Sequence, residues 1–104
     1  MYNETLENIK EYFTDIVNDH LIHSKDTRLF ESISKSLEDF IEKIEYDKLY
    51  VAVLLHDEFE KRIDKSDAVD DIYLDLLRES FEYVDWVKVA EEFLERHIKA
   101  MLPV

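Results

Sequence analysis

The sequence predicts an all-α fold, a compact bundle of four or five short antiparallel helices. Apolar residues recur every three or four positions along most of the 104 residues, which is the spacing of one helix face. Runs of Asp, Ser, Asn and Thr, which favour helix caps and turns, separate these periodic segments. A chain of this length has room for one hydrophobic core, so we expect residues 1–104 to form a single acidic helical domain.

The first two helices are expected over residues 4–23 and 28–45, and Asn3 is placed to cap the first. The apolar stripe of the first helix follows spacings of 4, 3, 4, 3 and 4 and consists of Tyr2, Leu6, Ile9, Phe13, Ile16 and His20. Cap-type residues at 24–27 interrupt this pattern. The stripe of the second helix consists of Phe30, Ile33, Leu37, Phe40, Ile41 and Ile44. We expect both stripes to face the core.

A third helix is expected over residues 48–63, where Asp47 is placed as its cap. Its run of seven apolar residues, Leu49 to Leu55, is apolar on all sides over two turns. We therefore expect this helix to be the most buried. A buried strand is the alternative, because several residues of the run are β-branched or aromatic. A helix is preferred, since a lone strand would find no partner elsewhere in the chain.

The last two helices are expected over residues 68–83, capped by Ser66 or Asp67, and over residues 86–101, capped by Asp85 and ended by the single proline. The stripe of the fourth helix consists of Val69, Ile72, Tyr73, Leu76, Leu77, Ser80 and Phe81. The inward residues of the fifth are Trp86, Val89, Ala90, Phe93, Leu94, His97, Ile98 and Met101. Three aromatic residues around the turn between these helices are expected in the core: Phe81, Tyr83 and Trp86.

The composition excludes several classes of site. Cysteine is absent, which removes disulfides, thiolate metal sites and thiol nucleophiles. Glycine is also absent, so the chain has no phosphate-binding loop and no dinucleotide-binding fingerprint. There is no apolar run of about 20 residues, and the first residues lack the basic and apolar regions of a signal peptide. We therefore expect a cytoplasmic protein, of a cell or of an infected host cell.

Four histidines raise the question of a metal site. His20 and His23 are three residues apart, and His56 and Glu60 are four apart, so each pair has the spacing of one helix face. Neither the H-E-x-x-H motif nor the paired E-x-x-H of di-iron bundles is present. His20 also continues the apolar stripe of its helix. We therefore expect no metal site and no cofactor.

Charge is the most informative feature of the chain. Asp and Glu number 26 against 13 Lys and Arg, a net charge of −13, which disfavours direct binding to nucleic acid or to an anionic membrane. In the second, third and fifth helices, acids precede bases by four residues, a favourable spacing. The pairs are Glu31–Lys35, Asp39–Lys43, Asp57–Lys61, Glu58–Arg62, Glu92–Arg96 and Glu95–Lys99.

The first and fourth helices instead carry rows of acids with few bases. The first acidic ridge consists of Glu4, Glu7, Glu11, Asp15 and Asp19. The second acidic ridge consists of Asp67, Asp71, Asp75, Glu79 and Glu82. Each like-charge pair four residues apart costs about 0.2–0.5 kcal/mol, so several pairs sum to roughly 1–3 kcal/mol. A strongly basic partner would relieve this repulsion, and we expect these ten residues to form its binding surface.

The function expected from this surface is that of a non-enzymatic inhibitor or interaction protein. Its acids would occlude the nucleic-acid channel of a basic protein, such as a nuclease, in the manner of a DNA mimic. A phage anti-defence protein, a nuclease immunity protein and an antitoxin share this physics. The alternative is a helical adaptor or structural bundle with an apolar working surface, whose charge serves only solubility. An enzyme and a surface that binds divalent cations are less favoured, and the sequence leaves the partner and the oligomeric state open.

Overall fold

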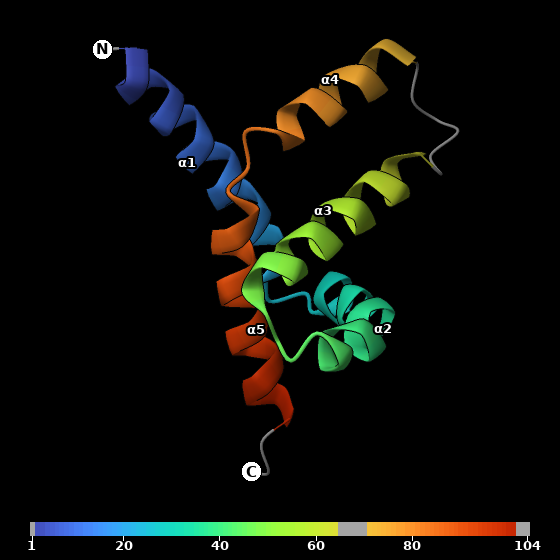
Figure 1. Cartoon of the computed structure of the whole chain (residues 1–104). Coiled ribbons are helices and arrows are strands. Elements are labelled where there is room, and N and C mark those ends of the chain that lie inside the picture. The colour runs from blue at the N-terminus through green and yellow to red at the C-terminus, as the bar shows by residue number, and fades with distance from the viewer. Residues whose placement is uncertain (1, 65–70, 102–104) are drawn as a thin grey trace.

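A computed structural model describes residues 2–64 and 71–101 of the chain. The described residues form five helices, namely α1 (Tyr2–Leu21), α2 (Arg28–Lys43), α3 (Lys48–Asp64), α4 (Asp71–Phe81) and α5 (Trp86–Met101) (Figure 1). No strand occurs in these described ranges, so the all-α prediction is confirmed and the strand alternative for residues 49–55 is wrong. None of the helices described has the length and apolar content needed to cross a bilayer.

Two of the predicted caps are confirmed. Asp47 Oδ1 accepts a hydrogen bond from the backbone N–H of Leu49 at 2.8 Å, and Asp85 Oδ1 accepts one from Lys88 N–H at 3.2 Å. These carboxylates satisfy N–H groups that have no partner inside the first turn of a helix. The cap predicted at Asn3 is wrong, because α1 already begins at Tyr2. The caps predicted at residues 66 and 67 lie outside the described residues.

The core lies where α3 crosses α5, and α2 and the end of α1 close it (Figure 1). Phe93 of α5 is fully buried at its centre, 5.1 Å from the ring of Phe30 on α2. The buried apolar residues are Leu21, Phe30, Ile33, Leu37, Ile41, Val51, Ala52, Leu55, Val84, Val89, Ala90, Phe93 and Leu94. The stripes predicted for α2 and α5 are therefore largely confirmed, although Phe40 and Ile98 are exposed.

The stripe predicted for α1 does not face the core. Leu6 is 48% exposed, and the stripe residues Ile9, Ile16 and His20 are exposed as well. The buried face of α1 instead consists of Thr14, Asn18 and Leu21, with Phe13 and Val17 half-buried beside them. This orientation places the Thr14 hydroxyl against the start of α5, where it hydrogen-bonds to the backbone.

Helices α3 and α4 are also more exposed than expected. Leu49, Tyr50 and Val53 face solvent, so α3 is not buried on all sides, because only its opposite face packs on α5. Ile72 of α4 is 66% exposed, and Leu76 and Leu77 are exposed too. Helix α4 packs on α3, and the first half of α1 extends away from it (Figure 1). The radius of gyration of 14.6 Å accordingly exceeds the about 13 Å typical of 100 residues.

Candidate interaction surface

The first acidic ridge follows the solvent side of α1. Glu7, Glu11, Asp15 and Asp19 are all exposed, and none of them forms an ion pair with another described residue. Four residues of helix advance about 6 Å along the axis, so these carboxylates form a row at that interval. The side chain of Glu4 lies outside the described part of the structure.

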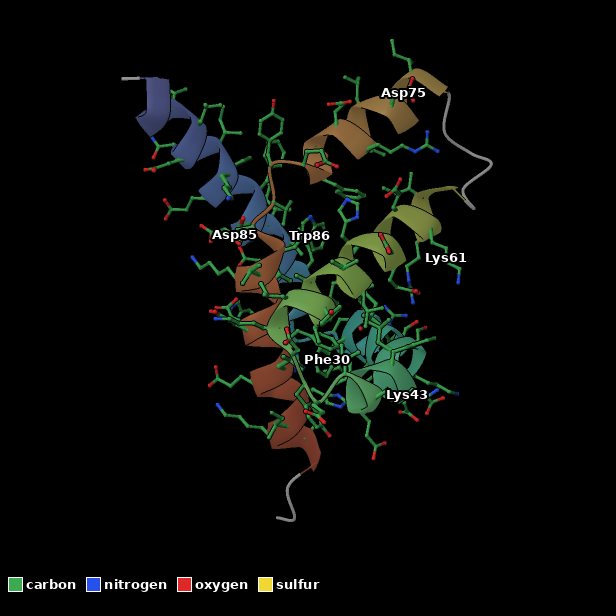
Figure 2. The ribbon with its side chains drawn as sticks, in the orientation of Figure 1. Phe30, Lys43, Lys61, Asp75, Asp85 and Trp86 are labelled. Carbon is green, nitrogen blue, oxygen red and sulfur yellow. The ribbon has the colours of Figure 1, made fainter. Side chains whose placement is uncertain are left out.

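The second acidic ridge is partly compensated by bases. Asp75, Glu79 and Glu82 are exposed on and just after α4, and Figure 2 labels Asp75 there. Asp75 lies 3.5 Å from the guanidinium of Arg78, and Glu82 lies 3.6 Å from Nε2 of His56. The position of Asp67 and the side chain of Asp71 lie outside what the structure describes. The first ridge is therefore the clearer example of uncompensated charge.

Two of the six ion pairs predicted within helices are present. Glu58 lies 3.2 Å from Arg62, and Glu95 lies 3.0 Å from Lys99. The other four are not among the ion pairs of the described residues, and Glu38, Asp39 and Glu42 of α2 are exposed without such a partner. The difference in charge compensation between α2, α3 and α5 on one side and α1 and α4 on the other is thus smaller than predicted.

Other charged side chains form bonds between different helices. The spacing of residues within one helix does not predict such bonds. Arg96 donates to the carbonyls of Leu21 and Ile22 at the end of α1, and its guanidinium lies 4.3 Å from the ring centre of Phe30. Lys48 of α3 bonds to Glu91 of α5 at 2.8 Å. The hydrogen bond that the Lys48 ammonium donates to the Glu91 carboxylate raises the pKa of Lys48.

A buried hydroxyl attaches α1 to the rest of the molecule. Thr14 is only 1% exposed. Its Oγ1 accepts a hydrogen bond from the backbone N–H of Asp85 at 2.8 Å and donates one to the Lys10 carbonyl at 2.7 Å. On the neighbouring side of α1, the ring of Phe13 stacks on Tyr83 at 6.3 Å. The first half of α1 extends from this attachment (Figure 1).

An aromatic cluster attaches α4. The indole Nε1 of Trp86 donates to the Phe81 carbonyl at 2.9 Å, and Figure 2 shows Trp86 at the start of α5. The ring of Phe59 on α3 lies 5.6 Å from Trp86 and 6.4 Å from Phe81. Phe81 and Trp86 are half-buried here, whereas Tyr83 is exposed, so the core position predicted for Tyr83 is wrong.

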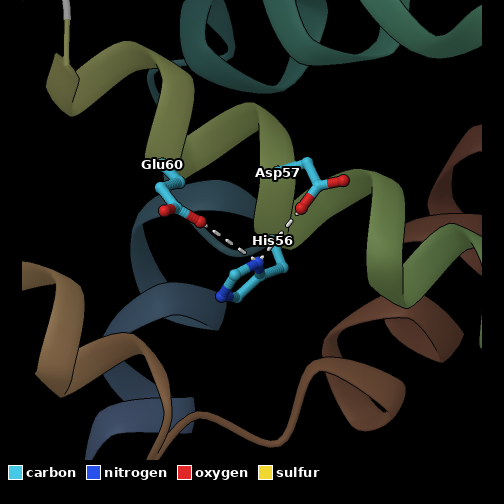
Figure 3. Close-up of side chains that lie close together, drawn as sticks. All are labelled: His56, Asp57 and Glu60. Carbon is cyan, nitrogen blue, oxygen red and sulfur yellow. Dashed lines mark hydrogen bonds and ion pairs between the residues drawn. The ribbon is translucent and has the colours of Figure 1, made fainter.

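His56 is surrounded by carboxylates (Figure 3). Its Nδ1 lies 3.3 Å from Asp57 Oδ1 and 3.7 Å from Glu60 Oε2, and its Nε2 lies 3.6 Å from Glu82. The face shared by His56 and Glu60 is thus as predicted. These groups are of types that bind divalent cations, but the two ring nitrogens are directed at different carboxylates. The absence of a functional metal site stays a prediction.

The remaining histidines serve other contacts. Nδ1 of His97 hydrogen-bonds to Ser34 Oγ at 2.8 Å, and its ring stacks on Phe93 at 6.1 Å. Nε2 of His23 lies 4.0 Å from Glu92. His20 is exposed, so its predicted role at the edge of the core is wrong.

A hollow lies between α2 and α3. Its volume is about 640 Å³, and its lining is Ser36, Leu37, Phe40, Leu54, Asp57, Glu58, Lys61 and Arg62. That volume is within the range of small-molecule sites. Glu58 and Arg62 pair with each other in its wall. The absence of enzymatic activity stays a prediction.

The exposure of large apolar side chains on the two helices that carry the acidic ridges does not follow from the sequence pattern. Those on α1 are Leu6, Ile9, Tyr12 and Ile16, and those on α4 are Ile72, Leu76 and Leu77. The stripe of α1 nevertheless has alternating spacings of three and four, which average 3.5 residues, the repeat of helices that pair with another helix.

Comparisons of the chain with models of protein families, with curated proteins and with solved structures give no match.

Proposed function

We propose that this protein is a non-enzymatic interaction protein whose two acidic ridges bind a basic protein. One observation carries the proposal: Glu7, Glu11, Asp15 and Asp19 form an exposed row without ion-pair partners among the described residues. Unrelieved repulsion along a helix lowers stability, and Lys and Arg side chains of a partner would relieve it.

The partner expected from this surface is a nuclease or another nucleic-acid-binding protein, whose channel presents Lys and Arg to phosphates. A row of carboxylates at intervals of about 6 Å would occupy that channel and exclude the nucleic acid. Inhibition by occlusion is consistent with a phage anti-defence protein, a nuclease immunity protein or an antitoxin, each active in a cytoplasm.

A second candidate is a helical adaptor that works through apolar contacts. The observation that favours it is the exposure of large apolar side chains on α1 and α4. The two candidates differ in their response to salt, because screening weakens contacts between charges and has little effect on apolar contacts.

Two variants that each remove three exposed charges test the first candidate. The ridge variant is Glu7→Gln, Glu11→Gln, Asp15→Asn on α1, and the control is Glu38→Gln, Asp39→Asn, Glu42→Gln on α2. Each protein is immobilised and exposed to native lysate at low and high salt, and retained proteins are identified by mass spectrometry.

A basic partner should be retained at low salt, released at high salt, lost by the ridge variant and kept by the control. Equal losses with both variants would assign the interaction to net charge alone. If the partner is retained equally at low and high salt, and equally by the wild type and the ridge variant, the adaptor is favoured.

A further inference from the structure

Helix α1 presents an aromatic ring to solvent on the side away from the core. Tyr12 is 64% exposed, and the buried Thr14 lies two residues later, about 200° around the helix. The rings of Tyr12 and Phe13 meet at 72° with their centres 5.7 Å apart, and Phe13 in turn stacks on Tyr83. Tyr12 is therefore accessible to a partner and is supported by two further rings.

Two acids of the first ridge share the face of Tyr12. Asp15 is three residues after Tyr12 and Asp19 is seven residues after it, which places them about 60° and 20° from it around the helix. Both acids are exposed, and neither forms an ion pair with another described residue. An exposed ring and two carboxylates without ion-pair partners in the described ranges thus lie on one face of α1.

The other end of the ridge has bases close to it. Glu7 and Glu11 line a hollow together with two lysines, Lys10 of α1 and Lys88 of α5. The ammonium groups offset part of the acid charge there. Lys10 also precedes Tyr12 by two residues, about 200° around the helix, so it lies on the opposite side of α1. The attraction for a basic partner should consequently be greatest at the end of the ridge that includes Tyr12.

Arginine is the base that best fits an aromatic ring beside carboxylates. Its planar guanidinium stacks on an aromatic face and still donates its N–H groups to a carboxylate, often two at a time. A lysine ammonium is more strongly hydrated and acts as a point charge. The molecule contains one such stack already, since the guanidinium of Arg96 lies 4.3 Å from the ring centre of Phe30 while it donates to backbone carbonyls.

We infer that Tyr12, Asp15 and Asp19 form an arginine-binding site for the basic partner. A guanidinium of the partner stacks on Tyr12 and donates to Asp15. Asp19, about 6 Å further along the axis than Asp15, accepts from a neighbouring base of the same partner. This inference rests on the proposed function and narrows the partner from any basic protein to one that presents arginine.

Tyr50 on α3 provides a matched control, because it is 63% exposed. Two acids lie at comparable spacings, Asp47 three residues before it and Asp57 seven residues after it. Asp47, however, accepts hydrogen bonds from two backbone N–H groups of α3. Asp57 is hydrogen-bonded to Nδ1 of His56. Tyr50 therefore tests an exposed tyrosine whose neighbouring acids already have partners.

Two homopeptides of equal length, one of arginine and one of lysine, test the inference at equal charge. Titration calorimetry at low and high salt measures the Kd of each peptide with the wild type and with four variants. The variants are Tyr12→Leu, Tyr12→Phe, the control Tyr50→Leu and the double variant Asp15→Asn, Asp19→Asn. Circular dichroism confirms that each variant keeps its helical content.

The informative quantity is the ratio of the Kd of the lysine peptide to that of the arginine peptide. Tyr12→Leu should lower this ratio about twofold to fivefold, because it removes one stacked guanidinium at an exposed site. Tyr12→Phe keeps the ring and should keep the ratio, and so should Tyr50→Leu. The double variant should weaken the binding of both peptides, since both bring positive charge to the acids.

Three results would overturn the inference. A ratio that Tyr12→Leu leaves unchanged, with both peptides bound in a salt-dependent manner, would remove the arginine site and leave the proposed function in place. An equal fall of the ratio in Tyr50→Leu would show that the acids beside Tyr12 contribute nothing specific. Binding of neither peptide at low salt would count against both proposals.

Discussion

Helices α1 and α2 have equally regular apolar stripes in the sequence, but the structure places those stripes in opposite environments. In α2, Ile33 and Ile41 are fully buried. In α1, Leu6 and Ile16 are exposed, while the polar side chains of Thr14 and Asn18 are buried. Periodicity therefore identifies the apolar face of a helix, but it does not determine whether the same chain covers that face.

The largest expected effect is a difference in the free energy of unfolding between one substitution in α2 and one in α1. Ile33→Ala should lower the free energy of unfolding by about 2–5 kcal/mol, because it leaves a cavity in the core. Ile9→Ala should lower it by less than about 1 kcal/mol, since exposed sites contribute little. Urea denaturation followed by circular dichroism measures both. Equal losses would mean that the α1 stripe is buried in solution.

A second test concerns the polar attachment of α1. Thr14→Val should lower the free energy of unfolding by about 1–3 kcal/mol, because it leaves the N–H of the half-buried Asp85 without its acceptor. Thr14→Ser keeps the hydroxyl and should recover most of that loss. Thermal denaturation of the wild type, Thr14→Val and Thr14→Ser measures these differences in stability. A Val variant as stable as the wild type would show that the hydroxyl does not hold α1 in place.

A substitution that changes charge on α1 should have a smaller effect, and it should raise the free energy of unfolding. Glu11→Lys replaces two repulsive contacts, with Glu7 and Asp15, by attractive ones four residues apart, and should raise the free energy of unfolding by about 1 kcal/mol. Glu95→Lys breaks the pair with Lys99 and should lower it by a few tenths of a kcal/mol. Both are measured by urea denaturation at low salt, and the two changes should shrink in high salt.

The smallest effect concerns the turn between the two helices. Arg28 donates to both carboxylate oxygens of Asp26 and thereby lowers the pKa of that carboxyl from its ordinary value. A carboxyl whose pKa is lower in the folded than in the unfolded state stabilises the fold at pH values above its unfolded pKa. This stabilisation is lost as the pH falls through the folded pKa. Asp26→Asn should therefore be less stable than the wild type at neutral pH and equal to it in strong acid. A difference that persists in acid would point to another cause.

Much of the fold follows from local chemistry that the sequence displays. Asp47 and Asp85 cap α3 and α5 because their carboxylates reach N–H groups two or three residues away. The ion pair of Glu58 with Arg62 is equally local. The pair of Lys48 with Glu91 joins residues 43 positions apart, and no spacing rule within a helix predicts it.

The sequence by itself determined five amphipathic helices, the core of α2 and α5, and an excess of acids on α1 and α4. Only the tertiary structure decided which faces are covered. Because Thr14 bonds to the start of α5 and Phe81 packs on Phe59, much of the apolar side of α1 and of α4 remains exposed. The physical reason is that helical periodicity arises within one helix, whereas burial depends on contacts between residues far apart in the chain.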